Sequence, residues 1–414
     1  MEITLILPVI LVATGLFLII RLRGFYLLHP FRTSREIICL LQDRDIRRSF
    51  FLALAGTLGV GNIFGVAAGI MIGGPGSLFW LFISSFFAMA IKYAETLLVF
   101  SYPEGSTIAS VIEKSFGRLG RFLSCIYALL TILLALFMGS AMQSVAFSEV
   151  VGSTVYISPL VSGLFLVILL IPCLVGGVGK IEKIVEFLIP MTTIIYILMC
   201  FSVILLNLDR VDNIVEVIVS SAFDPGAVVG GGVSFLALRE GFARGILSNE
   251  AGAGSSSMAH ARARNRSPHA GGLFALCEVF FDTTLLCTMT GMAILLSVDD
   301  PEAFSTPMSL VSAAFSSLGK LGSFTLVPII LCFAYATVIC WYYYGLEYSR
   351  LYLGRLSSAY PVLFSLAIVF SGLISDRLIL SVTDLCLLFM SILTLSVVVV
   401  NSDRIIVLSK KGTA

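Results

Sequence analysis

Two glycine-rich segments place polar groups inside otherwise apolar sequence, where they could bind a small charged molecule. Residues 54–65 read Leu-Ala-Gly-Thr-Leu-Gly-Val-Gly-Asn-Ile-Phe-Gly, and residues 230–234 read Gly-Gly-Gly-Val-Ser. An interior glycine weakens a helix by about 1 kcal/mol relative to alanine, and unpaired backbone in lipid is costlier still. Both segments are therefore predicted to interrupt helices where protein or water surrounds them. Close helix packing stays an alternative for Gly61 and Gly65 taken alone.

A helix broken between Leu58 and Gly61 would expose backbone groups suited to a zwitterion. The half that begins near Gly61 and Asn62 would present amide hydrogens and the positive end of the helix dipole to a carboxylate. The half that ends near Leu58 would present carbonyls to a sodium ion or an ammonium group. Neither segment carries a charged side chain at its break. Such backbone groups could bind the carboxylate and ammonium of a small amino acid together with a cation, without a charged side chain.

The elements that position these segments must be membrane helices. Of 414 residues, 58% are hydrophobic and 12% charged, about half the charge of an average soluble domain. A helix needs about 20 mostly apolar residues to cross a bilayer. The sequence predicts an all-α polytopic membrane protein with about eleven transmembrane helices, at residues 3–22, 50–72, 76–101, 121–147, 158–177, 184–207, 229–249, 270–297, 322–347, 359–375 and 378–400.

The positive charges orient these helices, because cytoplasmic loops are enriched in lysine and arginine. With the N-terminus outside, twenty-one of the 26 lysines and arginines fall in cytoplasmic segments, and only Arg210, Lys320 and Arg377 fall outside. The C-terminus is then cytoplasmic, and the expected location is the plasma (inner) membrane. Residues 307–318 are too short to span and are predicted to form a loop helix on the outer face.

The ten helices after the first divide into two sets of five, and each set begins with a glycine-interrupted helix. An odd number of spans inverts the second set, and paired broken helices indicate an inverted-repeat transporter with its site near the membrane midplane. The predicted parts are an N-terminal helix with a basic connector that lies at the interface (residues 1–49), the first repeat (50–207), the second repeat (229–400) and a cytoplasmic tail (401–414).

Four sequence blocks resemble the alanine or glycine:cation symporter family, also called sodium:alanine symporters. The resemblance covers nearly the whole chain, and its second block, with Ser-Asn-Glu-Ala-Gly at residues 248–252, is highly specific. The blocks lie at residues 57–95 (Thr-Leu-Gly-Val-Gly-Asn-Ile, Gly-Gly-Pro-Gly and Lys-Tyr-Ala-Glu), 244–261, 278–283 (Glu-Val-Phe-Phe-Asp-Thr) and 333–345 (Phe-Ala-Tyr-Ala-Thr and Trp-Tyr-Tyr-Tyr-Gly).

The resemblance implies a LeuT-like fold, a five-plus-five inverted repeat with an extra N-terminal helix. It implies sodium-driven import of alanine, glycine or a relative, D-alanine included, with no organic cofactor. Together with the break, it gives a substrate site at Gly59, Gly61, Asn62, Gln143, Thr337 and Trp341. It gives a sodium site at the carbonyls of Ala55 and Leu58 and the hydroxyl of Thr337.

The residues themselves agree with parts of this site. Thr337 and Trp341 are four positions apart and share a helix face, and an indole wall would leave room for only a small substrate side chain. Two alternatives stay open. Trp341 could instead belong to an interfacial aromatic belt, and Gln143 could serve only to connect its helix to a neighbouring one. Val60 and Ala336 stand where the family usually carries hydroxyl groups, so proton coupling stays open beside sodium coupling.

The Ser248-Asn249-Glu250 run is expected at the cytoplasmic end of the seventh helix. A structural role is favoured there, capping the helix and tying loops together, over a gate. Ionisable residues within spans are functional candidates by default, and Asp282 stands out because it lies well inside its helix. The others are Lys92, Glu95, Arg239, Glu240 and Glu278.

Three other classes of protein were weighed against a symporter. A channel can also use glycine-rich breaks, but these breaks lack pore-lining rings of charge. A membrane enzyme would need a nucleophile with its base, or metal ligands, and no such motif is present. A transporter of a larger amino acid stays open. The net charge of +1 argues against nucleic acid, and the expected partners are the substrate and the lipid bilayer, with no indication of oligomeric state.

Overall fold

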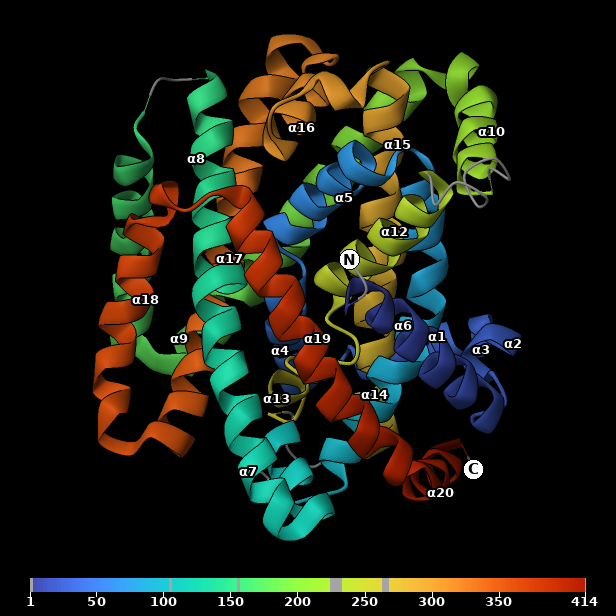
Figure 1. Cartoon of the computed structure of the whole chain (residues 1–414), viewed down its shortest axis with the longest axis vertical. Coiled ribbons are helices and arrows are strands. Elements are labelled where there is room, and N and C mark those ends of the chain that lie inside the picture. The colour runs from blue at the N-terminus through green and yellow to red at the C-terminus, as the bar shows by residue number, and fades with distance from the viewer. Residues whose placement is uncertain (1–2, 104–105, 155–156, 224–232, 263–267, 414) are drawn as a thin grey trace.

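The computed structural model describes residues 3–103, 106–154, 157–223, 233–262 and 268–413, which form helices joined by turns and short loops (Figure 1). Seven helical segments of this described part are long and apolar enough to cross a membrane. Their number and length are those of a multi-pass membrane protein. This count is lower than the eleven predicted spans for two reasons. It treats 159–206 and 319–369 as single segments of 48 and 51 residues, and it includes neither the first helix, whose described part is shorter, nor residues 233–249.

Each of these two long segments contains a left-handed glycine. Forty-eight residues of straight helix would measure about 70 Å, more than twice a bilayer's hydrocarbon core. Gly177 has φ 63° and ψ −171°, so it divides α9 (Pro159–Leu206) into two helices. Gly354 has φ 55° and ends α17 (Gly319–Leu353) before the 3₁₀ turn η5 (Gly354–Ala359) and α18 (Tyr360–Val369).

The N-terminal part contains the first helix, the connector and the predicted break. The connector is mostly helical, and the second predicted span begins six residues earlier than expected, at Arg44, where Asp43 caps the helix by accepting from the amides of Asp45 and Ile46. The elements are α1 (Ile3–Arg21), α2 (Phe25–Leu28), α3 (Pro30–Leu40), α4 (Arg44–Thr57), α5 (Val60–Gly73) and α6 (Gly76–Phe100).

The next part differs from prediction in two places. The predicted span at 121–147 belongs to a longer helical run that starts at Ile108, and Gly117 with φ 58° bends it near its polar end. Residues 211–222 form a helix that was not predicted; its apolar face buries Ile214 and Ile218. The elements are α7 (Ile108–Leu136), the π-helix η1 (Phe137–Met142), α8 (Gln143–Thr154), α9, η2 (Leu208–Arg210) and α10 (Val211–Ala222).

The C-terminal half follows the predicted order of helices. The short apolar piece near 307 is a helix, as expected, and it packs against α5 and α17. The remaining elements are α12 (Val233–Asn249), α13 (Ser257–His260), α14 (Pro268–Val279), the π-helix η3 (Phe280–Cys287), α15 (Thr288–Ser297), η4 (Pro301–Ala303), α16 (Pro307–Ser316), η6 (Ser371–Leu373), α19 (Asp376–Val400) and α20 (Ser402–Thr413).

The helices α4 and α5 occupy the middle of the molecule. Figure 1 shows them there, with α9 and α18 at one side and α1 to α3 at the other. In the apolar stretch of α4–α5, 94% of the residues are buried, against 28% in that of α9. The helices α6, α12, α14 and α17 pack around this centre. The interrupted helix is therefore enclosed by protein, as the cost of exposed backbone requires.

Candidate functional site

The helix break predicted near Gly59 is present. The helix α4 ends at Thr57, and α5 begins at Val60. Between them Leu58 (φ −85°, ψ 78°) and Gly59 (φ −127°, ψ −165°) leave helical geometry. The expectation that residues 55–62 do not form one regular helix is confirmed.

Three side chains predicted to bind substrate or sodium hydrogen-bond the backbone at this break. Gln143 Oε1 accepts from the Val60 amide at 3.0 Å. The Thr337 hydroxyl donates to the Ala55 carbonyl at 3.0 Å, and the Trp341 indole N–H donates to the Gly56 carbonyl at 3.0 Å. The two half-helices are thus hydrogen-bonded by different elements: α5 by Gln143 at the start of α8, and α4 by Thr337 and Trp341 of α17.

The glycine at the break makes room for these contacts. A Cβ on Gly59 would overlap Thr337 Oγ1 and lie 3.2 Å from Gln143 Oε1. A Cβ on Gly61 would meet only Met142 Sδ, at 4.0 Å. The tight position is therefore Gly59, which brings Gln143 and Thr337 together, whereas the start of α5 is less crowded.

Two backbone groups at the break have no hydrogen-bond partner in the part of the chain that the structure describes. They are the Leu58 carbonyl and the Gly61 amide. The amide of Leu58 is bonded to Leu54 O at 2.6 Å and that of Gly59 to Thr57 O at 3.0 Å. Buried backbone groups are nearly always paired, so one carbonyl and one amide are available to a cation and an anion.

Asn62 and Asp282 lie together beside α5. The Asn62 Nδ2 donates to the main-chain carbonyl of Asp282 at 3.3 Å, and both side chains are buried. Among the described residues, Asn62 Oδ1 and Asp282 Oδ2 have no hydrogen-bond partner. The other carboxylate oxygen of Asp282 accepts from the Thr283 hydroxyl. Asp282 therefore lies next to the break between α4 and α5.

Two π-helices flank the break, and sequence reasoning did not find them. The π-helix η1 ends at Met142, and its Met138 carbonyl accepts from Gln143 Nε2 at 3.0 Å. The π-helix η3 carries Asp282. Single π turns within α-helices occur often at functional sites. Gly139 in η1 lies so close to Trp341 that a Cβ there would overlap the indole side chain.

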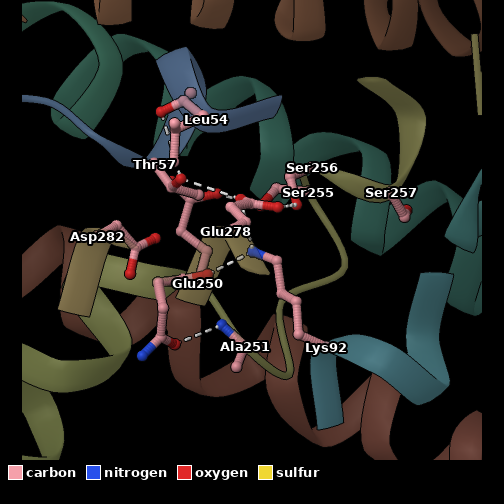
Figure 2. A network of polar contacts seen from close by, with 12 residues as sticks. Leu54, Thr57, Lys92, Glu250, Ala251, Ser255, Ser256, Ser257, Glu278 and Asp282 are labelled. Atoms are coloured by element: carbon pink, nitrogen blue, oxygen red, sulfur yellow. Dashed lines mark hydrogen bonds and ion pairs between the residues drawn. The ribbon is translucent and has the colours of Figure 1, made fainter. Parts of the chain in front are cut away.

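A buried ionic network lies directly against the end of α4 (Figure 2). Glu278 is its centre: Oε1 accepts from the Thr57 hydroxyl at 2.9 Å and lies 3.3 Å from Lys92 Nζ. Oε2 lies 2.6 Å from His260 Nε2 and accepts from the Ser256 hydroxyl at 3.3 Å. Lys92 and Glu278 are 1% and 0% exposed. Thr57 and His260 had not been singled out from the sequence.

The Ser248-Asn249-Glu250 run ends α12, as expected. Asn249 Oδ1 accepts from the Ala251 amide at 2.9 Å, and Asn249 Nδ2 donates to Thr283 Oγ1 at 3.2 Å. The Lys92 ammonium donates to the Asn249 carbonyl. These contacts cap the end of α12 and connect it to η3 and α6, two buried helices around the break. All three side chains of the run are at most 1% exposed.

A second interruption follows this run. Glu250, Gly252 and Gly254 have φ values of 53°, 87° and 74°, and helix resumes only at Ser257. Of the interruption predicted at residues 230–234, residues 230–232 fall outside the described residues, and Val233 and Ser234 belong to α12. The interruption at 250–256 lies at the other end of the same helix, and Glu278 connects it to the first break through Ser256 and Thr57.

Comparison with known proteins gives consistent results. A family model described as the sodium:alanine symporter family matches residues 1–411. The sodium/alanine symporter AgcS of Methanococcus maripaludis is 33% identical over 358 residues, 81% of this chain and 78% of that protein. The probable sodium/glutamine symporter GlnT of Bacillus subtilis is 30% identical over 430 residues, 98% and 86% of the two chains.

The fold is also similar to a solved structure. A mutant manganese transporter of Eremococcus coleocola superposes with a TM-score of 0.56, covering 85% of this chain and 78% of that one, at 16% sequence identity. At this identity the likeness concerns the arrangement of helices alone.

Proposed function

Because the chain belongs to the sodium:alanine symporter family, we propose that it is a secondary active symporter that imports a small neutral amino acid with sodium. The proposed substrates are alanine and glycine, D-alanine included. Family membership identifies a transporter of amino acids rather than an enzyme. The observation that carries the proposal is the break at Leu58–Gly59, surrounded by Gln143, Thr337 and Trp341.

The substrate carboxylate binds at the start of α5. The unpaired Gly61 amide and the positive end of the helix dipole attract it, and the Gln143 side chain can release the Val60 amide for the same purpose. Asn62 offers its unpaired Oδ1 to the ammonium group. Trp341, packed against Gly139, closes the site to large side chains.

Sodium binds at the end of α4. The proposed ligands are the carbonyls of Ala55 and Leu58 and the hydroxyl of Thr337. Thr337 already lies 3.0 Å from the Ala55 carbonyl, so two of the three oxygens are adjacent. A cation here also faces the negative end of the α4 dipole. Substrate and ion thus bind to opposite sides of one break, and this arrangement couples them.

The global arrangement is the LeuT-like one. It has eleven spans, with the N-terminus outside and the C-terminus in the cytoplasm, in the plasma (inner) membrane. Residues 50–207 and 229–400 are the inverted repeats, residues 1–49 precede them, and 401–414 form the tail. The interruption at 58–59 divides the first helix of the first repeat, and the interruption at 250–256 directly follows the first helix of the second repeat. Such paired interruptions support a site near the membrane midplane.

The network centred on Glu278 transmits movement between the two interruptions. Ser248, Asn249 and Glu250 lie where the second interruption begins, and Asp282 lies beside the first; in the proposed cycle these four residues act as a gate. Lys92 neutralises Glu278 and also binds the Asn249 carbonyl, so a shift of the second segment changes the contacts of Thr57. Binding of substrate and ion at the first break therefore changes the conformation favoured at the second interruption.

Uptake by purified protein in proteoliposomes tests the proposal. Labelled alanine should accumulate with an inward sodium gradient and should not accumulate when choline replaces sodium. Asn62→Ala and Gln143→Ala should each reduce uptake while the protein still inserts into the membrane. Normal uptake by both variants would refute the substrate site.

One alternative rests on a specific observation. Val60 and Ala336 lack the hydroxyl groups usual in the family, and four buried carboxylates surround Lys92. This favours proton coupling as the second candidate, with alanine or a larger amino acid such as glutamine as substrate. Uptake driven by a proton gradient in choline buffer would support it. Uptake that does not exceed the external concentration would instead indicate a channel.

A further inference from the structure

A cavity of about 390 Å³ lies where the N-terminal and C-terminal segments of the chain meet. Its walls come from the end of α1, from α2 and α3, from the start of α14 and from α20 (Figure 1). Its lining shares no residue with the break between α4 and α5. The cavity is therefore separate from the proposed transport site.

The lining of this cavity is strongly basic. Its cationic side chains are those of Arg21, Arg23, Arg32 and Lys410. Glu36 is the one carboxylate in the lining, and Arg21 also pairs with the exposed Asp403. The whole chain carries a formal net charge of only +1, so positive charge is concentrated here. The ligand that complements such a cavity is an anion.

The floor of the cavity holds a buried ring nitrogen without a partner. His269 Nδ1 lies 2.7 Å from the Tyr93 hydroxyl, which donates to Ser409 Oγ at 2.9 Å. These contacts tie α6, α14 and α20 together and fix the imidazole. Among the described residues, His269 Nε2 has no hydrogen-bond partner, because Glu36 Oε1 is 3.7 Å away. Because the Tyr93 hydroxyl donates to Ser409, Nδ1 of His269 donates to Tyr93, and Nε2 donates to a ligand oxygen in the imidazolium form, which a neighbouring anion favours.

One exposed apolar side chain lies at the edge of the cavity. Leu28 lines the cavity and is 69% exposed. On the neighbouring helix α3, Phe31 and Ile38 are 90% and 63% exposed, on the face of the helix opposite to the lining residues Arg32 and Glu36. In a membrane protein such side chains insert between acyl chains at the interface. A free anion would use the charges alone, whereas a lipid uses the charges and Leu28 together.

We infer that this cavity binds the phosphate headgroup of an anionic glycerophospholipid, with its acyl chains against the exposed side chain of Leu28. Basic pockets beside membrane helices recognise anionic headgroups through the same combination of charge and position. The bound lipid joins α1–α3 to α20 and stabilises the contact between the two ends of the chain. This inference does not depend on the identity of the transported solute.

Titration of the full-length protein in neutral detergent tests the inference. Phosphatidylglycerol should raise the midpoint of thermal unfolding, and phosphatidylcholine and inorganic phosphate should not. The double variant Arg23→Gln/Lys410→Gln removes two charges that are each expected to contribute about 1 kcal/mol near a lipid headgroup, so its affinity should fall about 30-fold.

Two further variants make the result interpretable. Arg23→Lys/Lys410→Arg keeps the charges and should retain the affinity, and Arg355→Gln removes an arginine outside the cavity and should behave as wild type. An equal shift with inorganic phosphate would overturn the lipid as ligand. The same affinity in the double glutamine variant and in wild type, or no response to phosphatidylglycerol, would overturn the site.

Discussion

The hydroxyl of Thr57 donates a 2.9 Å hydrogen bond to Oε1 of Glu278, 221 positions later in the chain. Thr57 is the last helical residue before the first interruption, and Glu278 also accepts from Ser256, the residue before α13. One carboxylate therefore hydrogen-bonds residues at both interruptions. Its charge is balanced by Lys92, which is as deeply buried.

Glu278→Gln is expected to destabilise the protein strongly. It leaves the Lys92 ammonium buried without its carboxylate partner, and breaking a buried pair in this way costs about 3–5 kcal/mol. The measurement is the thermal unfolding midpoint in detergent, together with alanine uptake. Glu347→Gln, which breaks a half-exposed pair with Arg350, is the matched control and should cost about 0.5 kcal/mol or less.

The double variant Lys92→Met/Glu278→Gln completes this cycle. Because it removes both charges, it should be more stable than Glu278→Gln alone. Strictly additive losses from the two single variants would show that the pair is not energetically coupled.

Gly59→Ala is expected to abolish uptake without preventing insertion. The added methyl group would overlap Thr337 Oγ1 and crowd Gln143 Oε1, and overpacking of this kind costs about 1–3 kcal/mol. Gly61→Ala should be much milder, because its nearest neighbour is Met142 Sδ at 4.0 Å. Gly179→Ala, with no atom within 4 Å, controls for the substitution itself. Equal uptake by the Gly59 and Gly61 variants would argue against the tight contact.

Thr337→Val should reduce the apparent affinity for sodium. It removes the hydroxyl that donates to the Ala55 carbonyl and that we assign as a sodium ligand. Loss of one such interaction, about 0.5–1.5 kcal/mol, corresponds to a change of about 2- to 12-fold in affinity. Thr337→Ser keeps the hydroxyl and should restore it. Sodium titrations of uptake decide the question, and an unchanged sodium dependence in the valine variant would remove Thr337 from the ion site.

Trp341→Phe should widen the range of substrates. It shortens the aromatic wall packed against Gly139 and removes the indole N–H that binds the Gly56 carbonyl. Leucine and glutamine should then compete better with labelled alanine than they do in the wild type. If leucine and glutamine compete equally well in the variant and in the wild type, Trp341 does not limit the size of the substrate.

The first interruption could be predicted from sequence, because Gly59, Gly61 and Asn62 are poor interior residues for a membrane helix and crowd one turn. The positions of Gln143 and Thr337 beside this break were predicted only from resemblance to a family. Composition alone does not indicate which distant helices pack against one another. The two halves of α9 could also be predicted from the charges near Lys180, although the bend itself needed the geometry of Gly177.

Other features could not be predicted in the same way. The contacts of Glu278 with Thr57 and His260 join three separate helices, and no local pattern encodes such pairs. The π-helices η1 and η3 shift backbone hydrogen bonds by one residue without a compositional signal. The second interruption did have a compositional signal, because Gly252 and Gly254 both adopt left-handed φ angles, which glycine tolerates best.

Gln143 and Thr337 hydrogen-bond two of the backbone groups proposed to bind cargo, the Val60 amide and the Ala55 carbonyl. In the proposed transport cycle the cargo therefore displaces these two side chains from the backbone, so that loading is an exchange of hydrogen-bond partners rather than the occupation of an empty space.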